Sequence, residues 1–222
     1  MTVTALDAID IPSFESKLAI LDTALSPGLF ARINAEVAAL IETERSYLLT
    51  HKKGGTVAYS TLRERAPALV GHYLSKDLRQ IVSRIVGLEL SPTPLHDESS
   101  CSVLFYEKPG DHINWHYDHN FYRGRHFTVL IPVVNRGCDG DLSAARLLAR
   151  QRGREVEIAT PPNRMIVFEG AKVRHKVTPI GEGERRAVWS MTYCTDPRNS
   201  AVQGVARRAK DTAFFGLRSL WT

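Results

Sequence analysis

The segment His116-Tyr117-Asp118 carries the residue types best suited to chemistry in this chain of 222 residues. Side chains on a β-strand alternate between two faces, so an imidazole and a carboxylate two residues apart point the same way. A second imidazole, that of His175, would complete a set of two histidines and one carboxylate. Such a set holds Fe(II) and leaves coordination positions open for substrate chemistry. Zinc accepts the same ligands, so the residue types alone leave the choice of metal open.

Two cations follow the second histidine of this set. Arg185 lies ten residues after His175, and Arg186 comes next. A guanidinium is a planar fork that fits a carboxylate in two hydrogen bonds, which would suit a dicarboxylic co-substrate. Because strand alternation admits only one of the two to a pocket, and Arg185 is an even number of residues from His175, we expect Arg185 to be the one. The alternative is that both are solvated turn residues after Gly183.

These residues belong to an ordered set of motifs that spans roughly residues 100–195. The motifs are Tyr106-Glu107-Lys108-Pro109-Gly110, His116-Tyr117-Asp118, Ile131-Pro132-Val133-Val134-Asn135, His175-Lys176-Val177-Thr178-Pro179 and Gly183-Glu184-Arg185-Arg186-Ala187. The set resembles the Fe(II)/2-oxoglutarate-dependent oxygenases. The resemblance implies that His116, Asp118 and His175 are the catalytic metal ligands. It also implies that 2-oxoglutarate and O₂ take the open positions, and that 2-oxoglutarate is decarboxylated to succinate as the substrate is oxidised.

Two further residues take a meaning from this resemblance. Tyr106 lies ten residues before His116, where prolyl-hydroxylase-like members have a tyrosine that donates its hydroxyl to 2-oxoglutarate. A core tyrosine with a satisfied hydroxyl is an equal alternative. Related halogenases have Gly or Ala in place of Asp118, which frees a site for chloride. The resemblance therefore favours hydroxylation, desaturation or ring closure over halogenation.

The residues that follow the metal motif include candidates for substrate binding. Asn120 shares strand parity with the two ligands, so it would face the metal if the strand continues, and otherwise it would cap a turn. The same parity would place Tyr117 and His119 on the opposite face. Arg123 and Arg125 would either rim the mouth of the site and grip a substrate carboxylate or form a solvated basic turn.

Lys53, next to Gly54-Gly55, allows the same two interpretations, and a flexible basic loop at this place could act as a lid.

The wider sequence predicts a mainly β domain with flanking helices. Helices are expected over residues 27–41 and from Pro67 to Gly87, with a basic glycine-containing loop at 50–58 between them. Strands are expected at 17–20, 102–106, 127–134, 164–168 and 186–193, separated by turns rich in Gly, Pro, Asn and Asp. Many short strands of this kind favour an antiparallel barrel or jelly roll, which the resemblance specifies as the cupin-like double-stranded β-helix.

The chain is expected to be a single domain over 1–222, since its length is ordinary for one. Residues 1–95 would form an N-terminal helical buttress and lid region, 96–196 the jelly-roll catalytic core, and 197–222 a C-terminal extension.

The amino-acid composition limits the binding partners and the location that we expect for this protein. Hydrophobic residues make up 43% and charged residues 24%, which is typical of globular proteins. The net charge of +5 comes from dispersed Lys and Arg, so no nucleic acid partner is expected. Three cysteines in no zinc-binding pattern favour reduced thiols and a cytoplasmic location. No signal peptide or membrane-spanning run is visible, so no membrane partner is expected, while a homodimer stays open.

The function that these features predict is oxidation of a small-molecule substrate. A small polar metabolite, a free amino acid or a derivative, is the first choice, in the setting of natural product biosynthesis. One alternative is a prolyl-hydroxylase-like enzyme that acts on a protein. Another is a cupin-like metal-binding isomerase without 2-oxoglutarate, which would have no need of Arg185.

Overall fold

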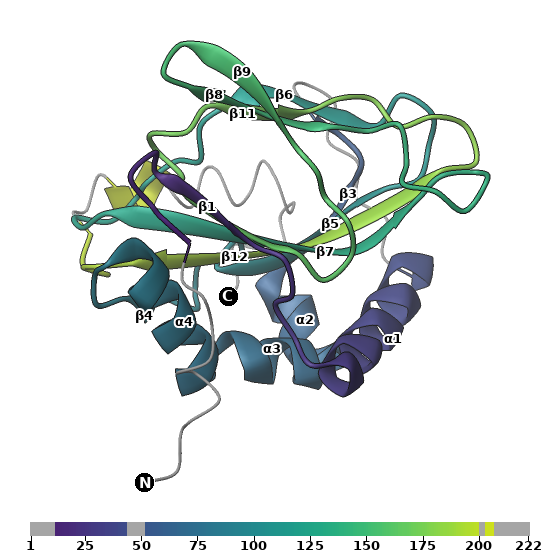
Figure 1. Ribbon diagram of the computed structural model, residues 1–222. Helices are drawn as coiled ribbons and strands as arrows, with labels where there is room; N and C mark the ends of the chain where they lie inside the picture. Colours follow the sequence, from purple (N-terminus) through teal and green to yellow (C-terminus); the bar gives the residue numbers. More distant parts are fainter. Residues whose placement is uncertain (1–11, 44–51, 200–202, 207–222) are drawn as a thin grey trace, which may run out of the picture.

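Two antiparallel sheets face each other in the computed structural model, which describes residues 12–43, 52–199 and 203–206 (Figure 1). The strands of the larger sheet are β1 (Leu18–Leu21), β3 (Gly55–Val57), β4 (Ser91–Pro92), β5 (Cys101–Tyr106), β7 (His126–Arg136), β10 (Met165–Glu169) and β12 (Arg185–Cys194). Those of the smaller sheet are β2 (Lys52–Lys53), β6 (His112–His116), β8 (Leu147–Gln151), β9 (Arg154–Ile158) and β11 (His175–Val177). Their orders are β1-β10-β7-β12-β5-β3, with β4 on β12, and β2-β6-β11-β8-β9. The predicted mainly β jelly roll is confirmed.

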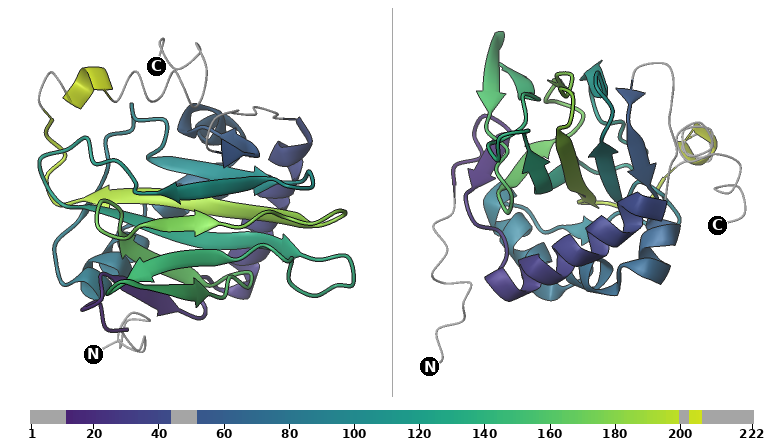
Figure 2. Two further views of the ribbon diagram at one scale, coloured as in Figure 1. Left: turned by 90° about the horizontal axis from the view of Figure 1, so that it is seen from above. Right: turned by 90° about the vertical axis from the view of Figure 1, so that its right-hand side faces the viewer.

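Four helices cover the outer face of the larger sheet, so the molecule has three layers (Figure 2). They are α1 (Pro27–Thr43), α2 (Tyr59–Arg65), α3 (Pro67–Tyr73) and α4 (Lys76–Val86). Helix α1 forms where it was predicted and buries Ile33, Val37 and Leu40. No helix in the described part of the chain is long and apolar enough to cross a membrane.

The expected long helix from Pro67 to Gly87 is wrong, because the chain breaks into α3 and α4 before Ser75. The backbone of Ser75 is extended, and its side chain accepts a hydrogen bond of 3.2 Å from the Leu78 amide. A serine in this position caps the start of a new helix. Gly87 does end α4, in a left-handed conformation with φ of 69°.

The expected loop at 50–58 is also wrong for the residues described, since β2 and β3 lie there. Gly55 in β3 packs directly on the ring of Phe105, where an added Cβ would meet the ring Cζ at 1.9 Å. A glycine pair therefore marks a close approach of strands here and not a loop. Residues 50 and 51 lie outside the described residues. Strands β1 to β4 come from residues 1–95, so the sheets include part of the expected helical buttress.

Apolar side chains form one core on each side of the larger sheet. The first lies under the helices, and Tyr73, Trp189 and Tyr193 are fully buried in it. The second lies between the sheets and includes Val177 and Phe168. The second core does not fill the space between the sheets alone, because ionisable side chains are buried there too.

A β-bulge shapes the smaller sheet at the point where β6 meets β11. His175 pairs with His116, but Val177 pairs with Ile113, so three steps along β6 match two along β11. The extra residue lets Ile113 and His116 both line the space between the sheets, although an unbroken strand would turn them to opposite faces.

A second bulge lies in the larger sheet, where Val133 is an extra residue of β7 relative to β12. Beyond it, Asn135 lies opposite Arg186.

Candidate metal centre and pocket

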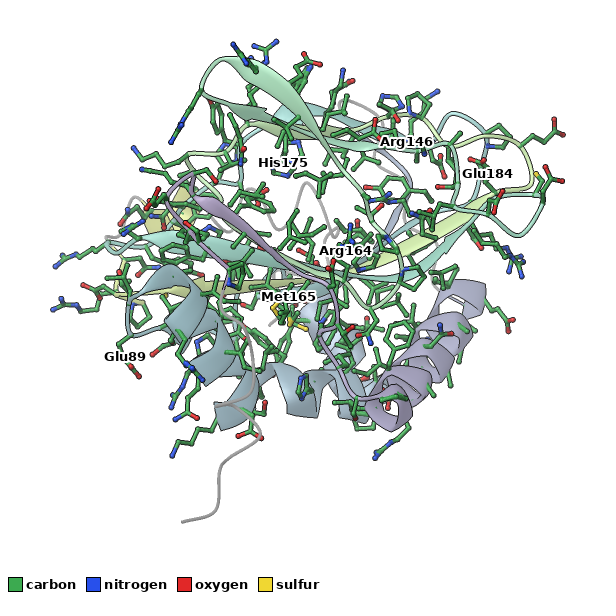
Figure 3. All side chains as sticks on the ribbon, viewed as in Figure 1. Glu89, Arg146, Arg164, Met165, His175 and Glu184 are labelled. Atoms are coloured by element: carbon green, nitrogen blue, oxygen red, sulfur yellow. The ribbon has the colours of Figure 1, made fainter. Side chains whose placement is uncertain are left out.

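The two candidate histidines lie directly opposite each other on neighbouring strands. His116 is the last residue of β6 and His175 the first of β11, and their ring centroids are 4.1 Å apart. Figure 3 shows His175 in the space between the two sheets. Asp118 follows two residues after the end of β6. The Nε2 atoms of His116 and His175 lie 3.6 and 3.8 Å from Oδ1 of Asp118. One ligand atom from each residue lies within 4.8 Å of the other two, so the three could hold one metal ion.

Hydrogen bonds fix which ring nitrogens face the centre. Nδ1 of His116 lies 2.7 Å from the carbonyl oxygen of Asn114, and Nδ1 of His175 lies 3.1 Å from that of Val173. A carbonyl only accepts, so each Nδ1 carries a hydrogen and each Nε2 presents a lone pair toward Asp118.

Electrostatics keep the ligand set in its metal-binding forms. Burial lowers the pKa of His175, against the pull of Asp118, so the neutral imidazole is favoured. Burial alone would raise the pKa of Asp118. His175, His116 and the Thr128 hydroxyl outweigh it and hold that pKa well below its usual range. The Thr128 hydroxyl donates a 2.5 Å hydrogen bond to Oδ2 of Asp118, so Oδ1 is the oxygen that faces the imidazoles.

A pocket of about 480 Å³ opens beside Asp118 and His116. Its described lining residues are Thr56, Asp97, Ser99, Ser102, Leu104, Ile113, His116, Tyr117, Asp118, His119, Phe121, His126, Thr128, Ser190, Thr192 and Ala206. The expectation that Tyr117 and His119 turn away from the site is wrong. The strand ends at His116, so strand alternation does not apply to the residues after it.

Asn120 caps a turn and does not face the metal. Its amide nitrogen donates to the Gly124 carbonyl at 2.7 Å, and its side-chain oxygen accepts from the Tyr122 amide at 2.9 Å. The side chain therefore stabilises the 120–124 turn, and it is not among the described residues that line the pocket.

The three cations considered for substrate binding do not line the pocket in the described structure. Arg125 makes a two-pronged ion pair with buried Glu169, at 3.1 and 2.8 Å. Arg123 and Lys53 have exposed side chains. For Arg125 the structure thus supplies a protein partner in place of a substrate carboxylate.

The expected orientation of the arginine pair is reversed. The Arg185 side chain is 63% exposed and its Nε lies 3.9 Å from Glu107, whereas Arg186 is only 2% exposed. Arg186 lies opposite Tyr106 on β5, with both residues buried. The prediction from the even spacing of His175 and Arg185 failed because the two residues are on different strands, β11 and β12. Inward and outward side chains alternate only within one strand, and a turn lies between these two.

Arg186 is a buried cation whose surroundings invite an anion. One of its terminal nitrogens donates to the Thr160 hydroxyl at 2.9 Å, while its buried Nε has no hydrogen-bond partner among the described residues. Within the same described part of the chain, no carboxylate is in ion-pair range of it. Burial raises the pKa of Tyr106 to about 12, against the effect of Arg186, so the phenol stays protonated and can donate.

Sequence reasoning missed two polar residues of the site. Thr128 lies between apolar residues of β7, Phe127 before it and Val129 after it. A hydroxyl buried in such a stretch needs a partner, and this signal would have found it. Asp97 is 3% exposed in the pocket wall, where it accepts hydrogen bonds from the Tyr122 hydroxyl at 2.7 Å and from the Ser99 amide. No pattern near Asp97 distinguishes it from a surface turn.

Solved structures that share this fold include a prolyl hydroxylase, a 2OG-Fe(II) oxygenase and an α-ketoglutarate-dependent epimerase. A prolyl hydroxylase from Trichoplax adhaerens, solved with a hypoxia-inducible-factor peptide, is 18% identical, with a TM-score of 0.65 over 82% of this chain and 84% of that one. A 2OG-Fe(II) oxygenase from Burkholderia pseudomallei is 17% identical, with a TM-score of 0.66 over 84% and 89%. SnoN, a non-heme α-ketoglutarate-dependent epimerase of nogalamycin biosynthesis, is 14% identical, with a TM-score of 0.63 over 80% and 77%.

The fold is therefore that of the Fe(II)/2-oxoglutarate-dependent oxygenases, as the resemblance implied. Within that class the chain belongs to the Halogenase D family, whose sequence model matches residues 11–139. The match includes His116 and Asp118 and ends before His175 and Arg186. No curated protein matches the chain.

Proposed function

We propose that this protein uses Fe(II) and 2-oxoglutarate to hydroxylate, desaturate or cyclise a small polar metabolite. The observation that carries the proposal is the convergence of three ligand atoms, two imidazole Nε2 and one carboxylate oxygen, at a single point beside a pocket. Two imidazoles and one carboxylate suit Fe(II) and leave positions open. When bound, iron and 2-oxoglutarate would supply oxidation of a C–H bond by O₂, with succinate and CO₂ as co-products.

Arg186 and Tyr106 are the proposed partners of 2-oxoglutarate. Arg186 offers a buried guanidinium that faces no protein carboxylate in the described structure, and Tyr106 offers a protonated hydroxyl on the neighbouring strand. A dicarboxylate with one end near the metal ligands would leave its other end for this pair. The buried unpartnered Nε of Arg186 supports a carboxylate at this place, because an unpaired buried donor is costly.

The pocket supports a substrate that carries an amino group, such as a free amino acid or a derivative. The Asp97 carboxylate, which is hydrogen-bonded to Tyr122 and Ser99, contributes negative charge to the pocket wall. The side chains of Tyr117 and Phe121 also line the pocket. The described lining residues include no Lys or Arg. Ammonium groups are recognised by carboxylates and aromatic faces, so this lining favours a cationic group over an anionic one.

Halogenation is the second candidate, since the family is described as Halogenase D. The Asp118 carboxylate opposes it. Its Oδ1 lies within 3.8 Å of both imidazole nitrogens, in the space that a halide on the metal would need.

Two further functions fit the structure less well. A metal-binding isomerase without 2-oxoglutarate would leave the buried Arg186 without a role. A protein substrate would need an open groove. Hydrogen bonds from Asn120 to the Gly124 carbonyl and from Tyr122 to Asp97 instead hold the 120–124 turn in place beside the pocket.

The test is spectroscopic and then catalytic. The anaerobic protein should give a weak visible charge-transfer band with Fe(II) and 2-oxoglutarate together and with neither alone. Admission of O₂ with a panel of amino acids should then release succinate in a substrate-dependent way. Absence of the band in the wild type, or an undiminished band in His175→Ala, would overturn the proposal.

A further inference from the structure

Gly170, the residue after β10, packs against the segment that carries Asp118 with no room for a side chain. A Cβ added to Gly170 would lie 2.8 Å from the Cβ of Asp118, 2.9 Å from Nδ1 of His126 and 3.0 Å from Oγ1 of Thr128. Real Cβ atoms essentially never approach another atom within 3.0 Å. The Cβ of Asp118 is bonded directly to the backbone, so it could yield only if the chain segment moved.

The backbone of Gly170 also connects this segment to the larger sheet. Its carbonyl accepts from the amide of Asp118 at 3.1 Å, and its own amide donates to the carbonyl of His126 at 3.1 Å. Asp118 lies beyond the end of β6, so the strand ladder does not hold it. It is held instead by this amide bond and by the Thr128 hydroxyl on its side chain.

Space, and not backbone conformation, explains the glycine. Gly170 is buried, and its φ is not in the left-handed region, in contrast to Gly87 and Gly183. Any residue could adopt this backbone conformation. The absence of a side chain at this position therefore corresponds to the close approach of Asp118.

We propose that Gly170 is a positioning residue for the carboxylate ligand. Without a Cβ at residue 170, Asp118 rests against β7 and β10, with Oδ1 at 3.6 and 3.8 Å from the two imidazoles. The inference rests on the proposed metal site, and it assigns to that site a residue that neither binds the metal nor touches substrate. Groups that orient a ligand without binding the metal typically change metal affinity by about 10- to 100-fold when mutated.

The first measurement is metal affinity in Gly170→Ala. Titration of the apoprotein with Co(II), followed by its visible absorption and by calorimetry, should show binding about 10- to 100-fold weaker than in the wild type. The matched control is Gly71→Ala in α3, where an added Cβ meets nothing within 4 Å; its Co(II) affinity should equal that of the wild type. Unchanged affinity in Gly170→Ala would overturn the proposal.

The second measurement keeps the proposal testable if Gly170→Ala folds poorly, and it requires no metal. In Asp118→Gly the nearest of the atoms that the added Cβ would meet is gone, while Nδ1 of His126 and Oγ1 of Thr128 remain. The melting temperature of the apoprotein should therefore fall less when Gly170→Ala is added to Asp118→Gly than when it is added to the wild type. An equal fall in both backgrounds would show that Gly170 packs generally and does not act through Asp118.

The two measurements distinguish a failure of the positioning role of Gly170 from a failure of the proposed metal site. A wild type that binds no Co(II) or Fe(II) would overturn the metal site, and with it the role of Gly170. A wild type that binds metal, together with a Gly170→Ala variant that binds it equally well, would overturn the positioning role alone.

Discussion

Arg186 and Tyr106 lie directly opposite each other on β12 and β5, and both are buried. Thr160 receives one hydrogen bond from the guanidinium, and Asn135, the neighbour of Arg186 on β7, donates to the same threonine at 3.0 Å. The cluster is therefore organised by protein contacts while the cation itself has no described counter-ion. Removal of Arg186 should therefore mainly weaken the binding of an anionic ligand.

Arg186→Gln should raise the Kd for 2-oxoglutarate by about ten- to a hundredfold, because a charge-assisted, two-pronged contact is worth about 1.5–3 kcal/mol. Anaerobic titration of the charge-transfer band measures this directly. Arg185→Gln, one residue earlier and exposed, is the matched control and should leave the Kd unchanged. The opposite pattern, with Arg185 sensitive and Arg186 not, would mean that the co-substrate lies elsewhere.

His116→Ala, Asp118→Ala and His175→Ala should each abolish substrate-dependent succinate release while the protein stays folded. The ligands lie in a barrel whose two cores are built from other residues. Circular dichroism checks the fold, and Fe(II) content after anaerobic desalting checks the metal. Near-normal succinate production in any of the three would remove that residue from the ligand set.

In high chloride the wild type should form oxygenated, desaturated or cyclised product and no chlorinated product, because the Asp118 carboxylate takes the position that a halide would need. Asp118→Gly should mainly lose iron, since two imidazoles hold Fe(II) less well than two imidazoles and a carboxylate. Mass spectrometry of products in chloride buffer is the measurement. A chlorinated product from the wild type would require another carboxylate, or none, in the ligand set.

Arg125→Ala should destabilise the fold and leave the KM for substrate unchanged, because Arg125 contacts Glu169 and not the pocket. Loss of the two-pronged bond to a carboxylate that is 5% exposed costs about 1–3 kcal/mol. The lower end is expected, since the Arg125 side chain is 45% exposed and solvent screens the pair. Urea unfolding at pH 7 measures the difference.

The same pair gives a pH dependence with a definite sign. Burial alone would raise the pKa of Glu169, but Arg125 and Lys17 outweigh it, so its pKa in the folded protein lies below the ordinary value of 4.5. The stabilisation is therefore complete above about pH 4.5 and is lost as the pH falls below it. This loss of stability at low pH should be smaller in Arg125→Ala.

For the Arg125→Ala variant itself, a higher KM for substrate without any loss of stability would assign Arg125 to substrate binding and not to the fold.

The sequence allowed prediction of those features that depend on residue type and order. His116, Asp118 and His175 are recognisable because few other roles explain two imidazoles and a carboxylate in that order, and the structure brings them together. Helix α1 was predictable because its apolar residues recur every four positions. The break before Ser75 was not, because Pro67 to Gly87 looks continuous until the serine is recognised as a cap.

Side-chain orientations were predicted wrongly where the residue count crossed the end of a strand. Asn120 was aligned with the ligands as if β6 continued, but the strand ends at His116. Arg185 was aligned with His175 across a turn. Gly170 carries no chemical signal of its own, because its importance lies in how closely Asp118 approaches it in space.

The two β-bulges give this site two positions at which the chain can lose a residue without moving a ligand. Deletion of Val133 would restore a regular ladder and keep Asn135 opposite Arg186, because the pairs on both sides of the bulge are already in register. Deletion of one residue between Ile113 and His116 would likewise keep His116 opposite His175. Deletion of a residue in a regular stretch of the same strands would instead shift the register by one and turn the side chains that follow to the other face. A single-codon deletion there would therefore dismantle this centre while every ligand residue remained in the sequence.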